Sequence, residues 1–265
     1  MLTTLRSVPT ALAMLVAIPI LRYHLPASKA AWWWVAASGV MMVTVFLGGF
    51  TEAIIRAGPG IASVLASTAP FFVAVIGRVF LGQRVRRRVL VGLIIGFVGV
   101  VLMASSQLGS DTGAGDKALG MGFAIAAALG WAVGTLLVKV LLTRHPDTDL
   151  IGLTTGQYLI GGIALLALTF PIEGTGGTDW ASGELWLSVA FISIVGSAIA
   201  TVAYFAALRG MNATTATAWL FLAPAVTVLL EITLGHTPKP LVLAGMAITI
   251  TGVAIVNAGG RRGSA

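Results

Sequence analysis

The chain has 265 residues, of which 57% are apolar and only 9% charged, with a formal net charge of +7. Soluble domains carry roughly 25% charged residues to keep their surface solvated, so this composition excludes a soluble fold and predicts a membrane protein. No cysteine is present, which excludes disulfides and thiolate metal sites. Basic residues gathered on one side of a membrane account for the positive charge without a nucleic-acid partner.

In chain order, nine apolar runs follow one another, each close to the roughly 20 residues that a helix needs to cross a bilayer. They are Val8 to Leu25, Trp34 to Ile55, Ile61 to Leu81, Val89 to Leu108, Leu119 to Leu142, Leu150 to Ile172, Leu185 to Leu208, Ala213 to Leu234 and Leu241 to Asn257. Barrel strands would be about ten residues long with strict alternation, so the runs predict an all-α polytopic bundle.

Basic residues divide unevenly between alternate loops. Ten lie on one side of the membrane: Arg22, Lys29, Arg84, Arg86, Arg87, Arg88, Arg144, Arg209, Arg261 and Arg262. Four lie on the other: Arg6, Arg56, Lys117 and Lys239. Because cytoplasmic loops are enriched in Lys and Arg, the first side is predicted to be cytoplasmic, together with the C-terminus, in a plasma (inner) membrane. With nine spans, the N-terminus lies outside.

The chain contains an internal repeat. LGQRVRRRVLVGLIIGFVGV, beginning at Leu81, matches LGHTPKPLVLAGMAITITGV, beginning at Leu234, in eight of twenty positions at an offset of 153. Upstream, Ala69-Pro70 answers Ala223-Pro224. The copies are five spans apart, an odd number, so they are predicted to cross the membrane in opposite directions. Inverted repeats of this kind are typical of secondary transporters, which open to either side around a central site.

The order of these motifs resembles the EamA-type repeat of the drug/metabolite transporter superfamily. The second copy carries it best, in ALGWAVGTLLVK from Ala128, AYFAALRGMNATTATAWLFLAPAVTVLLE from Ala203 and the glycine-rich helix from Leu241. The resemblance implies a transporter that moves amino acids, other metabolites or drugs, usually outward. It departs from the family at Gln83 and His236, where an acidic residue often follows Leu-Gly. It also departs in Val8 to Leu21, where the arginine often found in the family's second helix is absent.

The resemblance also implies two repeats of five helices. We expect a four-helix N-terminal repeat over residues 1–109 and a five-helix C-terminal repeat over residues 118–260, so that the family's first helix is missing. A start codon further upstream and a true nine-helix protein are both open explanations.

Ionisable groups within spans are the first site candidates, because burying charge in a bilayer is costly. Glu231 is a candidate for proton coupling or for binding a substrate amine, or else a carboxylate at the interface. Glu52 precedes Arg56 by four residues, the favourable order for an ion pair on one helix face, and is alternatively a gate or proton site. Arg78, the repeat equivalent of Glu231, and Lys139 are expected to extend to the interface.

Aromatic residues and prolines complete the candidates. Trp131, Tyr158, Tyr204 and Trp219 lie within spans, where they either line a substrate pathway or pack in the core. Pro70 and Pro224 interrupt the backbone hydrogen bonds of matching helices and are hinge candidates, or bends repeated by duplication. Trp32, Trp33 and Trp34 are expected to anchor a span at the interface.

Three functions are weighed: a secondary transporter, a non-transporting or truncated membrane partner, and a membrane-embedded enzyme. The enzyme is disfavoured because His24, His145 and His236 fall at helix ends, away from the isolated carboxylates. No cofactor or metal is expected, and no nucleotide-binding loop is present. The expected partners are a small-molecule substrate and the lipid bilayer, with protons as one choice of coupling ion. Substrate identity and oligomeric state are left open.

Overall fold

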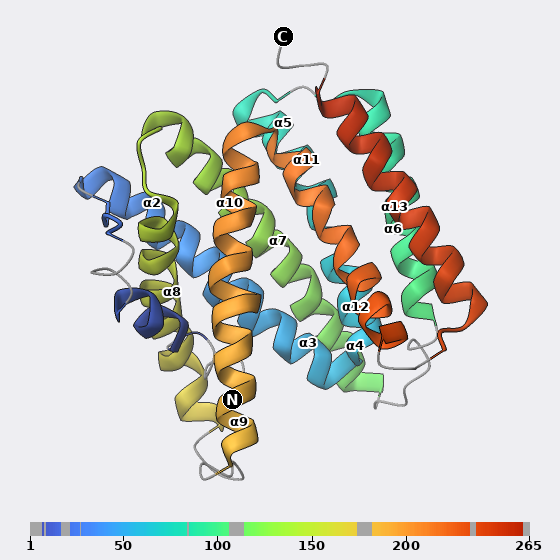
Figure 1. Cartoon of the computed structure of the whole chain (residues 1–265), viewed down its shortest axis with the longest axis horizontal. Helices are drawn as coiled ribbons and strands as arrows, with labels where there is room; N and C mark the ends of the chain where they lie inside the picture. Colours follow the sequence, from blue (N-terminus) through green and yellow to red (C-terminus); the bar gives the residue numbers. More distant parts are fainter. Residues whose placement is uncertain are drawn as a thin grey trace. The chain divides into compact units, whose positions relative to one another are not determined.

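The computed structural model describes residues 7, 9–16, 22–26, 28–83, 85–105, 114–173, 182–233 and 237–261. Over these residues the chain is helical and contains no strand (Figure 1). A bilayer offers no water to the backbone, and a helix satisfies every N–H and C=O within its own segment. The predicted all-α fold is confirmed.

The first four predicted spans after the N-terminal run correspond to seven elements. They are α2 (Lys29–Gly39), η1 (Val40–Gly48), α3 (Gly49–Ala57), α4 (Pro59–Ala66), α5 (Ala69–Leu81), α6 (Arg87–Ala104) and α7 (Ala114–Arg144). The remaining elements are α8 (Leu150–Glu173), α9 (Gly183–Phe191), η3 (Ile192–Ile199), α10 (Ala200–Gly210), α11 (Ala213–Ala218), η4 (Trp219–Phe221), α12 (Leu222–Thr233) and α13 (Pro240–Arg261).

Among the described residues, seven helices are long and apolar enough to cross a membrane, and a shorter apolar helix covers Ala213–Val226. The N-terminal run is helical over residues 9–16. Its predicted end at Leu25 is wrong, because residues 22–26 are not helical. Arg22 has a φ of 50°, a left-handed conformation that a helix cannot continue through.

The chain forms two compact units, and each is described by itself. Unit 1 comprises Met1–Gly48 and Val133–Gly210, and unit 2 comprises Gly49–Ala132 and Met211–Ala265. Each unit therefore draws segments from both halves of the duplicated sequence. The boundaries of the two repeats, 1–109 and 118–260, remain a prediction.

Unit 2 is built around α6 and α13, which carry the two copies of the repeated segment and lie side by side (Figure 1). Glycines set their close approach: a Cβ on Gly92 would lie 2.8 Å from the carbonyl oxygen of Gly252, and one on Gly99 would lie 2.6 Å from that of Gly245. The first residues of α6 meet the end of α13, since Gly259 approaches Arg88. The two helices therefore run antiparallel.

The glycine contacts also obey a two-fold symmetry. At the repeat offset of 153, Gly92 is equivalent to Gly245 and Gly99 to Gly252 (92 + 153 = 245; 99 + 153 = 252). Gly92 packs on the equivalent of Gly99, and Gly99 packs on the equivalent of Gly92. Such reciprocal contact is what a two-fold axis between two copies of one surface produces. The inverted relation of the two copies, predicted from an odd number of intervening spans, is confirmed for this helix pair.

The Leu-Gly pair that closes the first copy has a conformational reason. Gly82 ends α5 with a φ of 62°, a left-handed conformation that glycine adopts without strain. The N–H of Gln83 then bonds to the carbonyl of Gly77 at 3.0 Å and satisfies one of the open carbonyls of the last turn. The second Leu-Gly pair, at 234–235, and His236 lie outside the described residues.

The helical spans that contain Pro70 and Pro224 are each interrupted just before the proline. Residues Ser67 and Thr68 form a turn between α4 and α5, so that Pro70 is the second residue of α5. In the second copy, the short 3₁₀ segment η4 separates α11 from α12, and Pro224 is the third residue of α12. A proline has no N–H to donate to the carbonyl four residues earlier, which weakens the helix at that point.

Unit 1 contains two π-helical segments, η1 and η3, each inserted in the middle of a span. Adding the repeat offset of 153 to Val40–Gly48 gives residues 193–201, which nearly coincide with η3 at Ile192–Ile199. The wide π-turn therefore occurs at equivalent places in the two copies. Residues in π-helices make up well under 1% of proteins, and these turns often lie at functional sites.

Candidate functional site

Two tyrosines singled out from the sequence, Tyr158 on α8 and Tyr204 on α10, take part in hydrogen bonds along one face of α10 in unit 1. The hydroxyl of Tyr158, on α8, lies 3.3 Å from Oγ1 of Thr201, and the hydroxyl of Tyr204 lies 2.9 Å from Oγ1 of Thr135, on α7. Thr201 and Tyr204 are three residues apart, which places them on one side of α10. We call Thr135, Tyr158, Thr201 and Tyr204 the hydroxyl cluster; it joins α7, α8 and α10 through uncharged polar groups.

A second polar contact in unit 1 joins α8 to α2. The side-chain amide of Gln157 donates to Oγ of Ser38 at 2.6 Å, and both side chains are buried, with 1% and 0% exposed. The hydroxyl of Ser38 in turn donates to the carbonyl of Val35 at 3.1 Å. Polar groups buried in apolar surroundings need such partners, because an unsatisfied one costs about 1–3 kcal/mol.

The π-helix η1 is held to α8 by a further hydroxyl. Oγ1 of Thr44 donates to the carbonyl of Gly161 at 2.8 Å. Glycine makes this approach possible, since a Cβ on Gly161 would lie 2.4 Å from the carbonyl oxygen of Gly39. The contacts of η1 and α2 progress along α8 in the same direction, so these helices run parallel, as expected for spans separated by an even number of crossings.

Lys139, which the sequence suggested would extend to the interface, contacts the end of a neighbouring helix. Its side chain is partly buried, and Nζ donates to the carbonyl of Leu208 at 2.8 Å. Leu208 lies in the last turn of α10, where carbonyls have no partner within the helix. The ammonium therefore caps the C-terminal end of α10, where the helix dipole also favours a positive charge.

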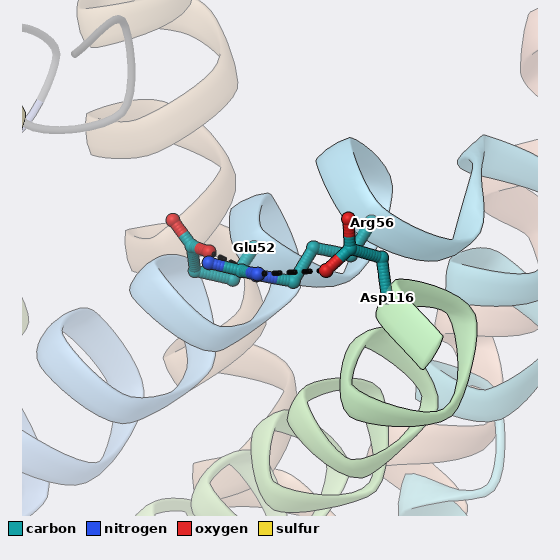
Figure 2. A network of polar contacts seen from close by, with 3 residues as sticks. All are labelled: Glu52, Arg56 and Asp116. Carbon is teal, nitrogen blue, oxygen red and sulfur yellow. Dashed lines mark hydrogen bonds and ion pairs between the residues drawn. The ribbon is translucent and has the colours of Figure 1, made fainter. Parts of the chain in front are cut away.

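In unit 2, the predicted pair of Glu52 and Arg56 is confirmed and gains a third member. Nε of Arg56 lies 2.8 Å from Oε2 of Glu52, and Nη1 lies 3.4 Å from Oδ1 of Asp116 at the start of α7 (Figure 2). The guanidinium also lies 5.8 Å from the ring centroid of Phe123. The side chains of Glu52 and Arg56 are about one-third exposed, so the network is only partly screened by solvent.

The other candidates also belong to unit 2. Trp131 is partly buried on α7, and Trp219 is 45% exposed in η4. Glu231 lies on α12, and its side chain is outside the described part of the structure. The structure therefore brings Tyr158 and Tyr204 together through α10, and it places Glu52 in an ion-pair network.

Sequence reasoning missed the partners of these residues. The signal that could have found them is their residue type, because polar residues within apolar runs often make contacts between helices. These residues are Thr135, Thr201, Ser38 and Gln157. Asp116 could have been found as a partner of Arg56, because both fall on the side of the membrane with few basic residues. No residue pattern indicated η1 or η3.

Comparison with known proteins agrees with these features of the fold. The sequence matches the EamA-like transporter family over residues 1–105 and 118–258, almost the whole chain. The chain belongs to the EamA-like transporter family. It is therefore a membrane transporter with a polytopic helical fold, and the resemblance seen in the residue motifs is confirmed.

Several curated proteins are similar over most of the chain. The uncharacterized transporter YvbV of Bacillus subtilis is 26% identical over 93% of this chain and 78% of its own length. The uncharacterized inner membrane transporter YedA of Escherichia coli K12 is 27% identical over 84% of this chain and 70% of its own. A probable terminal-alkyne amino-acid exporter of Streptantibioticus cattleyicolor is 28% identical over 75% of this chain and 64% of its own.

The same fold occurs in a protein of known crystal structure. The superposition covers 100% of this chain and 89% of the other, with a TM-score of 0.78 and 20% sequence identity. At this identity the likeness establishes the fold alone. The superposition therefore supports the polytopic helical fold.

Proposed function

We propose that this transporter exports a small metabolite, amino acid or drug across the plasma (inner) membrane by alternating access of its two inverted repeats, with its C-terminus in the cytoplasm. The outward direction is supported by the similarity to a probable amino-acid exporter. The cytoplasmic C-terminus is supported by the excess of basic residues on that side of the spans.

One observation carries the proposal: the reciprocal glycine packing of α6 and α13. Two copies of one helix related by a two-fold axis can exchange roles, so that the arrangement open to one side has a counterpart open to the other. At the contacts of Gly92 with Gly252 and of Gly99 with Gly245 the two backbones meet directly, so equivalent surfaces of the two copies form the interface.

Two pairs of repeated backbone irregularities give the halves places to bend. The breaks beside Pro70 and Pro224 are one pair, in unit 2, and η1 and η3 are the other, in unit 1. A helix yields where its hydrogen-bond ladder is interrupted, since fewer bonds resist a change in direction. Their occurrence at equivalent positions in both copies supports a mechanical role for the two prolines.

The hydroxyl cluster is our candidate for part of the substrate pathway. Its groups are uncharged, and each tyrosine can exchange its threonine partner for a polar substrate while its ring contacts an apolar part. Trp131 and Trp219 are candidates for further contacts in unit 2. Protons are the proposed coupling ion, with Glu231 as the carrier and Glu52 as the alternative.

Transport by the purified protein in liposomes tests this function. Vesicles are loaded with a panel of labelled amino acids and cationic drugs, and release is measured with and without a pH gradient. We expect gradient-dependent release of at least one compound by the wild-type protein and slower release by Tyr204→Phe. A protein that moves none of the panel in either direction, while correctly folded, would favour the non-transporting partner instead.

Sidedness of the two repeats is tested separately. The chain has no cysteine, so the separate variants Gln83→Cys and His236→Cys each contain a single thiol. We expect a membrane-impermeant thiol reagent to label one of them from outside intact cells and the other only after the membrane is opened. Labelling of both from the same side would contradict the inverted arrangement and the mechanism built on it.

A further inference from the structure

A cavity of about 680 Å³ lies at one end of unit 1, where α7 ends and α8 begins. Its polar lining consists mainly of His24, Arg144, His145, Asp147, Asp149 and Arg209. The volume falls in the range of about 300–1,000 Å³ that is usual for small-ligand sites. No part of the hydroxyl cluster lines it, so the cavity is separate from the candidate pathway.

Two guanidinium groups in the lining are held in place by the protein and keep donors available. The guanidinium carbon of Arg144 lies over the ring of Trp34, 5.3 Å from its centroid, a cation–π contact that occupies no N–H donor with an acceptor atom. Arg209 donates one N–H to the carbonyl of Thr148. A guanidinium has five N–H donors in one plane, so both groups retain several for an oxyanion.

The carboxylates of the lining are unequal. Asp149 accepts three backbone N–H groups, from Ile151 at 2.8 Å, Gly152 at 3.2 Å and His24 at 3.3 Å, and so caps the start of α8. Its charge is therefore largely engaged by the backbone. Asp147 is exposed, and its carboxylate adds negative charge to the lining.

The cavity lies at the ends of two candidate membrane spans, where lipid headgroups are expected. The apolar spans of α7 and of α9 to α10 end at Arg144 and Gly210, next to the two arginines. Trp34 is the kind of residue that concentrates at the membrane interface. Leu25, Pro26, Ala31 and Leu150 provide an apolar part of the lining, which suits the glycerol end of a lipid.

We propose that this cavity binds the phosphodiester headgroup of an anionic phospholipid, with Arg144 and Arg209 donating to its phosphate oxygens. Arginine is suited to phosphate because its planar donors match two oxygens at once. Basic pockets between helices at the headgroup level are a known way for membrane proteins to hold such lipids.

Binding of phosphatidylglycerol to the purified full-length protein in detergent tests the proposal, with phosphatidylcholine as the reference lipid and native mass spectrometry as the readout. We expect Arg144→Gln and Arg209→Gln each to weaken phosphatidylglycerol binding by about tenfold or more, the loss of a charge-assisted hydrogen bond. Arg87→Gln is the matched control: Arg87 is also exposed at the end of a span, but it lies outside the cavity. It should leave binding unchanged.

A variant that gains affinity keeps the test decisive if the arginine variants fold poorly. Asp147→Asn removes a negative charge from the lining and should strengthen phosphatidylglycerol binding several-fold. Equal binding by wild type and all variants would overturn the proposal. So would displacement of the lipid by millimolar inorganic phosphate, because the cavity would then be a site for free anions. Transport is not measured, so failure here leaves the proposed function untouched.

Discussion

Replacing Gly99 with alanine tests the helix pair on which the inverted repeat rests. A Cβ at this position would lie 2.2 Å from Oγ1 of Thr249 and 2.6 Å from both the carbonyl oxygen of Gly245 and the backbone nitrogen of Thr249. Ordinary contact begins near 3.4 Å, so the backbone of α13 must retreat by about 0.8 Å (3.4 − 2.6). The threonine side chain can rotate, but the backbone atoms cannot.

The expected cost follows from two opposing effects. Overpacking a tight contact costs about 1–3 kcal/mol, whereas alanine gains up to about 1 kcal/mol over glycine within a helix. Contacts this short place the overpacking cost at the upper end of its range, about 2–3 kcal/mol, so the net loss is about 1–2 kcal/mol. For a chain of this size, each kcal/mol lowers the melting temperature by about 2–4 °C, so we expect a decrease of several degrees.

Thermal unfolding in detergent, followed by tryptophan fluorescence, measures this decrease. Gly122→Ala is the matched control, because a Cβ there meets nothing within 4 Å and Gly122 lies on the helix α7 of the same unit. It should melt at or slightly above the wild-type temperature. The repeat equivalent, Gly252→Ala, should match Gly99→Ala in sign and size, since its Cβ would lie 2.3 Å from the nitrogen of Gly96.

The double variant, which combines Gly99→Ala with Gly252→Ala, adds a second check. Once one alanine has separated α6 from α13, the second alanine causes a smaller clash. The decrease in melting temperature of the double variant should therefore be smaller than the sum of the decreases of the two single variants. If Gly99→Ala and Gly122→Ala melt at the same temperature, the reciprocal glycine contact does not exist, and the symmetry argument fails with it.

Three further predictions concern the candidate residues. Glu231→Gln should abolish transport driven by a pH gradient in liposomes while exchange without a gradient persists; unchanged driven transport removes Glu231 as the proton carrier. Tyr204→Phe loses the 2.9 Å contact with Thr135 and should raise the substrate concentration at half-maximal rate several-fold with a smaller effect on thermal stability. Asp116→Asn should lower stability by less than about 1 kcal/mol in denaturant titration, because its bond to Arg56 is long and Asp116 is 70% exposed.

The sequence was sufficient for the helices and their duplication. Apolar runs such as Ile61 to Leu81 leave the backbone no other way to satisfy its hydrogen bonds in a bilayer, and α4 and α5 fill that run as predicted. The ion pair of Glu52 and Arg56 could also be predicted from the sequence, because the two residues are four apart on one helix and this spacing brings their side chains together. The prediction failed at the end of the first run, where Arg22 has a left-handed backbone conformation. The partner of Lys139, at the end of a neighbouring helix, was not predicted.

What the sequence by itself determined were properties set within one segment: which stretches span the membrane, which copies correspond, and where a glycine or proline ends a helix. Only the tertiary structure decided which helices face each other. The bond of Tyr204 to Thr135 and the packing of Gly99 on Gly245 join residues far apart in the chain. In a bilayer every helix surface is apolar, so helix pairing is selected by the fit of small residues and a few hydroxyls between helices, and this fit exists only once the helices meet.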